Sequence, residues 1–252
     1  MKLKKIAVLC LVIIVLVQAM IFSASAASGK GYIFTFTWED LNTRGAGSTT
    51  VLRHLWNMGY DAGESLNNGA ATAYSVLPNS AICVIDSHGG AGYICLGTDE
   101  NPSLIGANIA SNGNNRSISA LSANALSHTR LVLYAGCDTG LTSSSYGNLV
   151  TGTYGKGAQC VVGWNCTIYS GPTVDWIRLL FEKASNEHEV LWECFNHADY
   201  WVEDIWGSTY SDMLNNRRKP GISRSIYIGD MRMPRDREHR TYLIKLRIGE
   251  NK

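Results

Sequence analysis

The ten residues 81–90, Ala-Ile-Cys-Val-Ile-Asp-Ser-His-Gly-Gly, decide how this sequence folds. The unbroken apolar run that opens them is typical of a strand buried on both faces of a parallel sheet. The run stops at Ser87, His88 and two glycines, which favour a turn. A second apolar run, Leu-Val-Leu-Tyr-Ala at 131–135, ends in the same way at Gly136-Cys137-Asp138-Thr139-Gly140. The sequence therefore predicts two core strands, each followed by a reactive side chain flanked by glycine.

Further strands and helices alternate around these two runs. Residues 32–38 alternate aromatic and β-branched side chains as a strand does, and residues 159–164 form another apolar strand. The spacing of apolar residues predicts helices near 48–58, 70–77, 117–126, 172–185 and 187–201, with a hairpin-like stretch at 92–97. Strands that alternate with helices indicate an α/β sandwich, in which helices cover both faces of a mainly parallel sheet.

The amino terminus has the features of an export signal. Lysines within residues 1–5 precede an apolar run at 6–22 and the small residues Ser-Ala-Ser-Ala-Ala at 23–27, as in a signal cleaved after Ala26 or Ala27. We therefore divide the chain into a secretory signal peptide at 1–26, an α/β domain at 28–210 and a basic extension at 211–252. We expect a secreted, extracellular protein. An uncleaved membrane anchor is the alternative, because the apolar run is close to the minimum length of a span.

The overall net charge of +1 conceals two regions of opposite charge. Residues 28–216 contain 8 basic and 17 acidic residues, whereas residues 217–252 contain 11 basic and 4 acidic ones. The acidic body argues against nucleic acid as a partner, because binding phosphates needs a basic face. For the basic segment three interpretations stay open: contact with anionic polymers of the cell envelope, contact with the acidic body, or a solvated edge.

Six cysteines follow the signal: Cys83, Cys95, Cys137, Cys160, Cys166 and Cys194. An even number in an exported protein permits a disulfide framework, and the sequence leaves the pairing open. Cys83, Cys160 and Cys194 lie in apolar or helical contexts, where a free cysteine commonly serves as a small buried hydrophobe. Cys137 differs, because glycine precedes it at the end of a strand.

His88 and Cys137 occupy the position at which parallel sheets gather reactive groups, the carboxyl ends of the strands. Glycine beside each side chain lets a substrate carbonyl approach the backbone, whose N–H groups can stabilise an oxyanion. Attack by cysteine requires the thiolate, which a nearby imidazolium favours. We therefore predict a Cys/His pair. Taken singly, His88 could be a loop histidine and Cys137 a buried thiol. No metal site is predicted, because no second histidine-rich cluster joins Asp86 and His88.

The two strand ends, together with Gly-Ala-Gln-Cys-Val-Val-Gly-Trp at 157–164, resemble the caspase-fold (clan CD) cysteine peptidases, which include caspases, gingipains, clostripain, separase and CHAT domains. CHAT sequences are the most similar, since their nucleophile strand reads small residue, Cys, acidic residue, Thr. The resemblance implies a caspase-like three-layer sandwich and an endopeptidase that acts on proteins or peptides without a cofactor. Cys137 would be the nucleophile and His88 its acid–base partner. The backbone N–H groups of Gly89 and Cys137 would form the oxyanion hole.

The resemblance also implies a pocket for the residue before the scissile bond. Its expected lining is Glu39, Asp40, Ala135, Asp138 and Trp164. The chain has Tyr-Ala-Gly-Cys where caspases have Gln-Ala-Cys, so cleavage after Asp is not expected. The acidic pair Glu39-Asp40 suits Arg or Lys, although a loop or helix cap explains it as well.

A different class of function remains open beside the endopeptidase. A catalytically inactive module with the same fold could bind peptide or envelope material through the same surface. The sequence leaves the physiological substrate, the activation mechanism and the oligomeric state undetermined.

Overall fold

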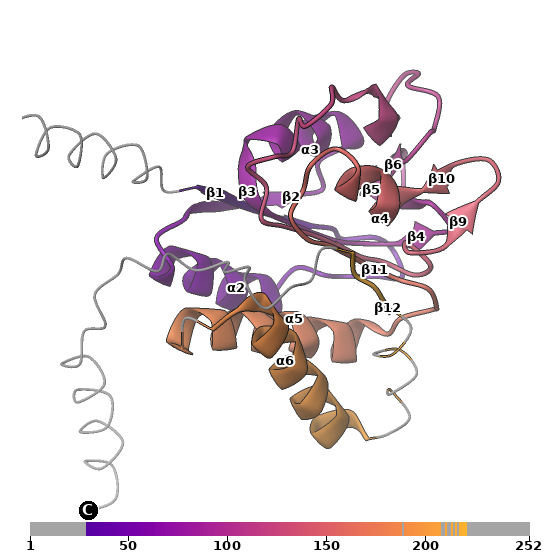
Figure 1. Ribbon diagram of the computed structural model, residues 1–252. Coiled ribbons are helices and arrows are strands. Elements are labelled where there is room, and N and C mark those ends of the chain that lie inside the picture. Colours follow the sequence, from indigo (N-terminus) through magenta and orange to yellow (C-terminus); the bar gives the residue numbers. More distant parts are fainter. Residues whose placement is uncertain are drawn as a thin grey trace, which may run out of the picture.

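A six-stranded, mainly parallel sheet forms the middle layer of the protein (Figure 1). The computed structural model describes residues 29–187, 189–207, 210, 213, 215 and 217–220. The strand order is β12-β11-β8-β3-β1-β2, with β12 antiparallel to β11 and the other neighbours parallel. The strands are β1 Lys30–Thr35, β2 Asp61–Leu66, β3 Ser80–Asp86, β8 Leu131–Ala135, β11 Val161–Trp164 and β12 Arg217–Arg218. The predicted α/β class and mainly parallel sheet are confirmed.

The central strands β3 and β8 are apolar because both of their faces are covered. Along β3, Ile82 and Val84 face one hydrophobic core, whereas Cys83 and Ile85 face a second core on the other side. Every residue of β8 is buried. Alternate side chains of a strand point to opposite faces, so a strand between two cores must be apolar throughout.

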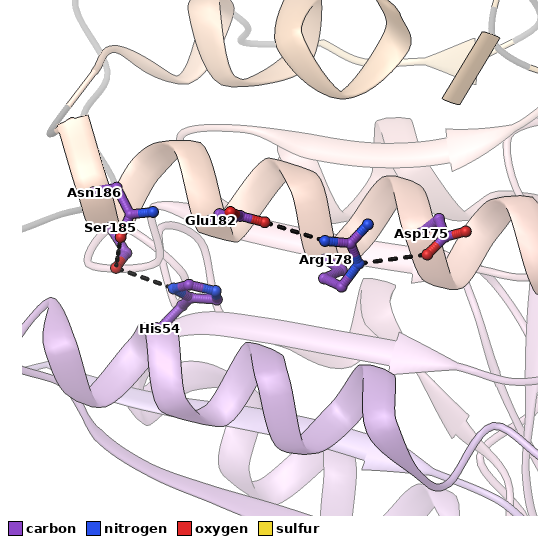
Figure 2. Close-up of polar contacts among 6 residues, drawn as sticks. All are labelled: His54, Asp175, Arg178, Glu182, Ser185 and Asn186. Carbon is purple, nitrogen blue, oxygen red and sulfur yellow. Dashed lines mark hydrogen bonds and ion pairs between the residues drawn. The ribbon is translucent and has the colours of Figure 1, made fainter. Parts of the chain in front are cut away.

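Three helices cover one face of the sheet: α2 Ala46–Asn57, α5 Ser170–Glu187 and α6 Leu191–Trp206 (Figure 1). Figure 2 shows the polar contact between the first two, in which Nδ1 of the buried His54 on α2 lies 3.1 Å from Ser185 Oγ on α5. Burial, followed by the nearby Arg53 charge, lowers the pKa of His54, so this interface holds a neutral imidazole at neutral pH.

The opposite face carries two short helices and a four-stranded sheet, as the upper part of Figure 1 shows. The helices are α3 Ala70–Val76 and α4 Leu149–Tyr154, and the strands are β4 Gly89–Gly90, β5 Tyr93–Thr98, β6 Asn101–Gly106 and β7 Arg116–Ser117. A small hairpin, β9 Thr142–Ser143 with β10 Gly147–Asn148, precedes α4.

The helix predicted at 117–126 is wrong. The chain instead forms one 3₁₀ turn at Ile118–Ala120 followed by turns. Asn124 has φ of 60°, which an α-helix cannot contain, and the Leu126 N–H donates to Lys156 O outside the segment. Serine and asparagine side chains compete for backbone hydrogen bonds, so this Ser/Asn-rich stretch favours turns.

The edge strand β12 comes from the segment assigned by sequence to the basic extension. Arg217 has a side chain only 2% exposed, and its Nη2 lies 2.6 Å from Asp199 Oδ2 on α6. Its guanidinium also lies 4.8 Å from the centre of the Trp176 ring. The start of the basic segment is therefore part of the folded sheet. The predicted signal peptide and residues 221–252 lie outside the described residues. Within the described ranges, no helix has the length and apolarity needed to cross a bilayer.

Candidate active site

The loops that follow β3 and β8 touch at the carboxyl edge of the sheet. The two strands pair in register up to Asp86 and Ala135, so the next residues of each emerge side by side. A Cβ added to Gly136 would lie 2.9 Å from Ser87 O and 3.1 Å from Gly89 N. Only glycine allows this backbone contact without displacement. The contact brings the loop that carries His88 against the loop that carries Cys137.

The segment after β1 holds the His88 ring. His88 Nε2 lies 2.8 Å from Asp40 Oδ1, and the Trp38 ring lies beside the imidazole with its centroid 5.7 Å away. Trp38 Nε1 also donates a 2.8 Å hydrogen bond to Ser87 Oγ. The hydrogen bond with His88, and then the charge of His88, lower the pKa of Asp40, so Asp40 is a carboxylate that accepts a hydrogen bond from the Nε2–H of His88. This tautomer leaves Nδ1 as the nitrogen that can exchange a proton with a reacting group.

The Cys137 thiol lies against the segment between β11 and α5. The Ile168 N–H donates to Cys137 Sγ at 3.4 Å, and the thiol donates back to Ile168 O at 3.7 Å. An N–H directed at sulfur stabilises negative charge there. Cys137 is also partly exposed, as a nucleophile must be.

Four other thiols are unsuited to attack. Burial raises the pKa to about 12 in Cys83, Cys160 and Cys194 and to about 11 in Cys95. These cysteines therefore stay protonated at neutral pH and act as small apolar side chains. Among the residues that the structure describes, neither they nor Cys137 form a disulfide.

The five side chains expected to line a substrate pocket have different surroundings. Asp40 contacts His88, whereas Glu39 is exposed and its N–H donates to Asp99 Oδ2 at 2.9 Å. Asp138 is partly buried, with φ of 57° and its N–H donating to Cys166 O. Ala135 and Trp164 are buried, and the Trp164 ring packs edge-on against Trp176 at 5.6 Å. Their side chains therefore present no surface to a substrate.

Sequence reasoning missed the residues that contact the His88 and Cys137 side chains. Asp40 was expected to bind substrate, and neither Trp38 nor Ile168 was expected near the site. The position of Asp40 could have been found, because β1 and β3 were both expected in the parallel sheet and their carboxyl ends meet at one edge. Ile168 gives no such signal, since it lies in an irregular segment. In the part of the chain that the structure describes, no group of three or more His, Cys, Asp or Glu residues is placed to hold a metal ion.

Comparisons with known proteins support the fold. No protein-family model and no curated protein matches the sequence. Among solved structures, the Arg-specific cysteine proteinase gingipain R is similar with a TM-score of 0.58 and 8% sequence identity, over 79% of this chain and 48% of that chain. A complex of the pro- and mature domains of Porphyromonas gingivalis RgpB gives a TM-score of 0.55, also at 8% identity, over 79% and 49% of the two chains.

These similarities define the class of fold. The protein has the caspase-like fold of the clan CD cysteine proteinases, and it spans about half the length of the gingipain chains that it matches. The finer resemblance to CHAT domains stays a prediction.

Proposed function

We propose that the protein is an exported cysteine endopeptidase that cleaves after basic residues, with Cys137 as nucleophile and His88 as acid–base catalyst. The observation that carries the proposal is the backbone contact between Gly89 and Gly136, because it brings the two loops together. The caspase-like fold supports the proposal. One structural neighbour is itself described as Arg-specific, and the acidic body of this chain suits a basic substrate.

In the first half of the reaction, the Cys137 thiolate attacks the carbonyl carbon of the scissile bond. A C–S bond forms, and the carbonyl oxygen becomes an oxyanion that accepts hydrogen bonds from the N–H groups of Gly89 and Cys137. The His88 imidazolium then gives its Nδ1 proton to the leaving amine, and the C–N bond breaks. Asp40 supports this step by accepting the Nε2–H and stabilising the imidazolium.

In the second half, neutral His88 removes a proton from a water molecule, which attacks the thioester carbon. The tetrahedral intermediate expels Cys137 as thiolate, and the peptide acid leaves. The protonated imidazole and the thiolate are then restored as a pair. These steps require no metal or organic cofactor.

Labelling with electrophilic peptides tests the proposal directly. A peptidyl acyloxymethyl ketone ending in Lys or Arg should modify Cys137, as located by mass spectrometry under reducing conditions. Cys137→Ala and His88→Ala should abolish labelling, whereas Cys95→Ala, which removes a partly buried thiol, should retain it. If the folded protein reacts with no member of a broad probe panel, the inactive binding module becomes the better account. Export is tested separately, by determining whether the mature chain begins after Ala26 or Ala27.

A further inference from the structure

On the face of the central sheet that packs on α2 and α5, the side chains of three neighbouring strands change from apolar to polar or small in the last row, at the carboxyl ends of the strands. Ile33, Val84 and Leu133 lie side by side in the apolar core. The next residues on this face of the same three strands are Thr35, Asp86 and Ala135, of which Asp86 and Ala135 are paired in register. At the carboxyl edge, two polar side chains and one small side chain therefore replace an apolar row.

A narrow cavity lies between this last row, the start of α2 and the first turns of α5. Besides apolar side chains, it is lined by the Asp86 side chain and by the hydroxyl-bearing residues Thr35, Thr43 and Ser48. Its free space has room for about one water molecule. Thr43 fixes one wall, because its Oγ1 donates a 2.8 Å hydrogen bond to the backbone oxygen of Asp86.

The Asp86 carboxyl lacks a compensating partner. Among the described residues, no N–H or O–H group donates to its side-chain oxygens and no cation pairs with them. Burial raises its pKa to about 7, although the residue keeps some exposed surface that gives access from outside. A buried carboxylate without a partner is unfavourable, and a bound cation removes that penalty.

We propose that Asp86 binds the ammonium group of a lysine side chain, that of the residue before the scissile bond, because an ammonium group is about the size of the one water molecule that the cavity admits. This inference rests on the proposed function. Asp86 stands two residues before His88, and its register partner Ala135 stands two residues before Cys137, so the cavity lies at the same carboxyl edge of the sheet as the two candidate catalytic side chains.

The size of the cavity selects lysine over arginine. An ammonium group is compact and carries three N–H donors, which Asp86 and the threonine and serine hydroxyls can accept. The guanidinium of arginine is a wider planar fork that needs more room. This assignment replaces the acidic pair expected from sequence, because Asp40 is engaged with His88 and Glu39 is exposed.

The test compares matched peptide substrates that end in Lys, Arg or norleucine before the bond, norleucine having an aliphatic chain of similar length without the ammonium. We expect kcat/KM for Lys to exceed that for norleucine by at least about tenfold, as for an ion pair formed in a partly buried site. Asp86→Asn should remove most of this ratio. Glu39→Gln, at the exposed acid, should leave the ratio unchanged. An unchanged ratio in Asp86→Asn, or a preference for Arg over Lys, overturns the inference.

A binding measurement separates this inference from the proposed function. In the Cys137→Ala protein, calorimetry should detect a Lys-ended product peptide binding at least about tenfold more tightly than its norleucine-ended analogue. The difference should vanish when Asp86→Asn is added. Absence of Cys137 labelling with retained lysine-selective binding contradicts the peptidase but supports the pocket. Labelling of Cys137 without lysine-selective binding supports the peptidase but contradicts the pocket. Asp86→Asn removes a partly buried, unpaired charge, so thermal unfolding should show a variant at least as stable as the original protein.

Discussion

Replacing Gly136 by alanine should separate the two loops of the candidate site. The added Cβ would lie 2.9 Å from Ser87 O and 3.1 Å from Gly89 N, both backbone atoms that cannot rotate away. Ordinary contacts of this kind begin near 3.4 Å, so the loops must part by about half an ångström. Overpacking of this size costs about 1–3 kcal/mol of stability, or roughly 2–12 °C in Tm for a domain of this size. Because a misplacement of about 1 Å can cost about a hundredfold in rate, we expect roughly tenfold slower labelling of Cys137.

The assay measures the second-order rate of Cys137 labelling at a temperature at which circular dichroism shows the variant to be folded. Gly63→Ala is the matched control, because a Cβ at Gly63 would meet no atom within 4 Å. The control should label at the original rate and melt within about 2 °C of the original protein. If the folded Gly136→Ala protein labels as fast as Gly63→Ala, the reasoning that the glycine contact aligns the site is refuted.

Three further perturbations test separate parts of the structure. Asp40→Asn should slow Cys137 labelling about tenfold or more, because Nε2 of His88 loses its carboxylate partner. Asp40→Glu, which keeps a carboxylate, should restore part of the rate. Equal labelling rates for the original protein and both variants would exclude a positioning role for Asp40. His54 has a pKa lowered from 6.5 by burial, so the stability it supports is complete above pH 6.5 and falls as the pH drops below that value, by at most about 1.4 kcal/mol per pH unit. Urea unfolding between pH 7.5 and pH 5 should therefore show a flatter pH dependence in His54→Asn, and an unaltered slope would contradict this explanation. Arg217→Ala should lower the free energy of unfolding by about 1–3 kcal/mol because it removes the cation that pairs with Asp199, which keeps its hydrogen bond from Trp176, whereas the exposed Arg44→Ala should change it by less than about 0.5 kcal/mol. Equal thermal melts for these two arginine variants would show that the ion pair does not anchor β12.

The core strands could be predicted from sequence because a strand buried on both faces is an unbroken run of apolar residues. The limits of β8 were predicted to the residue, and those of β3 to within one residue, since each apolar run ends at a polar residue or a glycine. The segment around 117–126 could not be predicted in this way. Ile118 and Leu126 are both buried and have helical spacing, yet the hydrogen bond from Leu126 N–H to Lys156 O holds the segment in turns. That contact depends on residues about 30 positions away, which local spacing does not reveal.

The two candidate catalytic residues could be predicted from sequence, whereas their surroundings could not. Strand ends and glycines point to His88 and Cys137, because topology fixes where parallel strands finish. The surroundings of these two side chains depend on loops. From sequence, Asp40 was identified as an acidic residue of the expected substrate pocket, although its carboxylate contacts His88. Asp86 was considered only as a metal ligand, because the cavity beside it, and the lack of a partner for its side-chain oxygens among the described residues, are visible only in three dimensions.

The direction of β12 determines how the chain can be shortened. β12 runs antiparallel to β11, and the Val161 N–H donates to Pro220 O, so residue 220 lies at the amino end of β11, at the opposite edge of the sheet from His88 and Cys137. A chain that stops at residue 220 keeps every strand among the described residues, whereas one that stops at 210 loses β12 and exposes the backbone edge of β11 to pairing with other molecules. An expression plan that trims the basic residues should therefore place its stop codon after Pro220, and an affinity tag added there would begin at the edge opposite the candidate site.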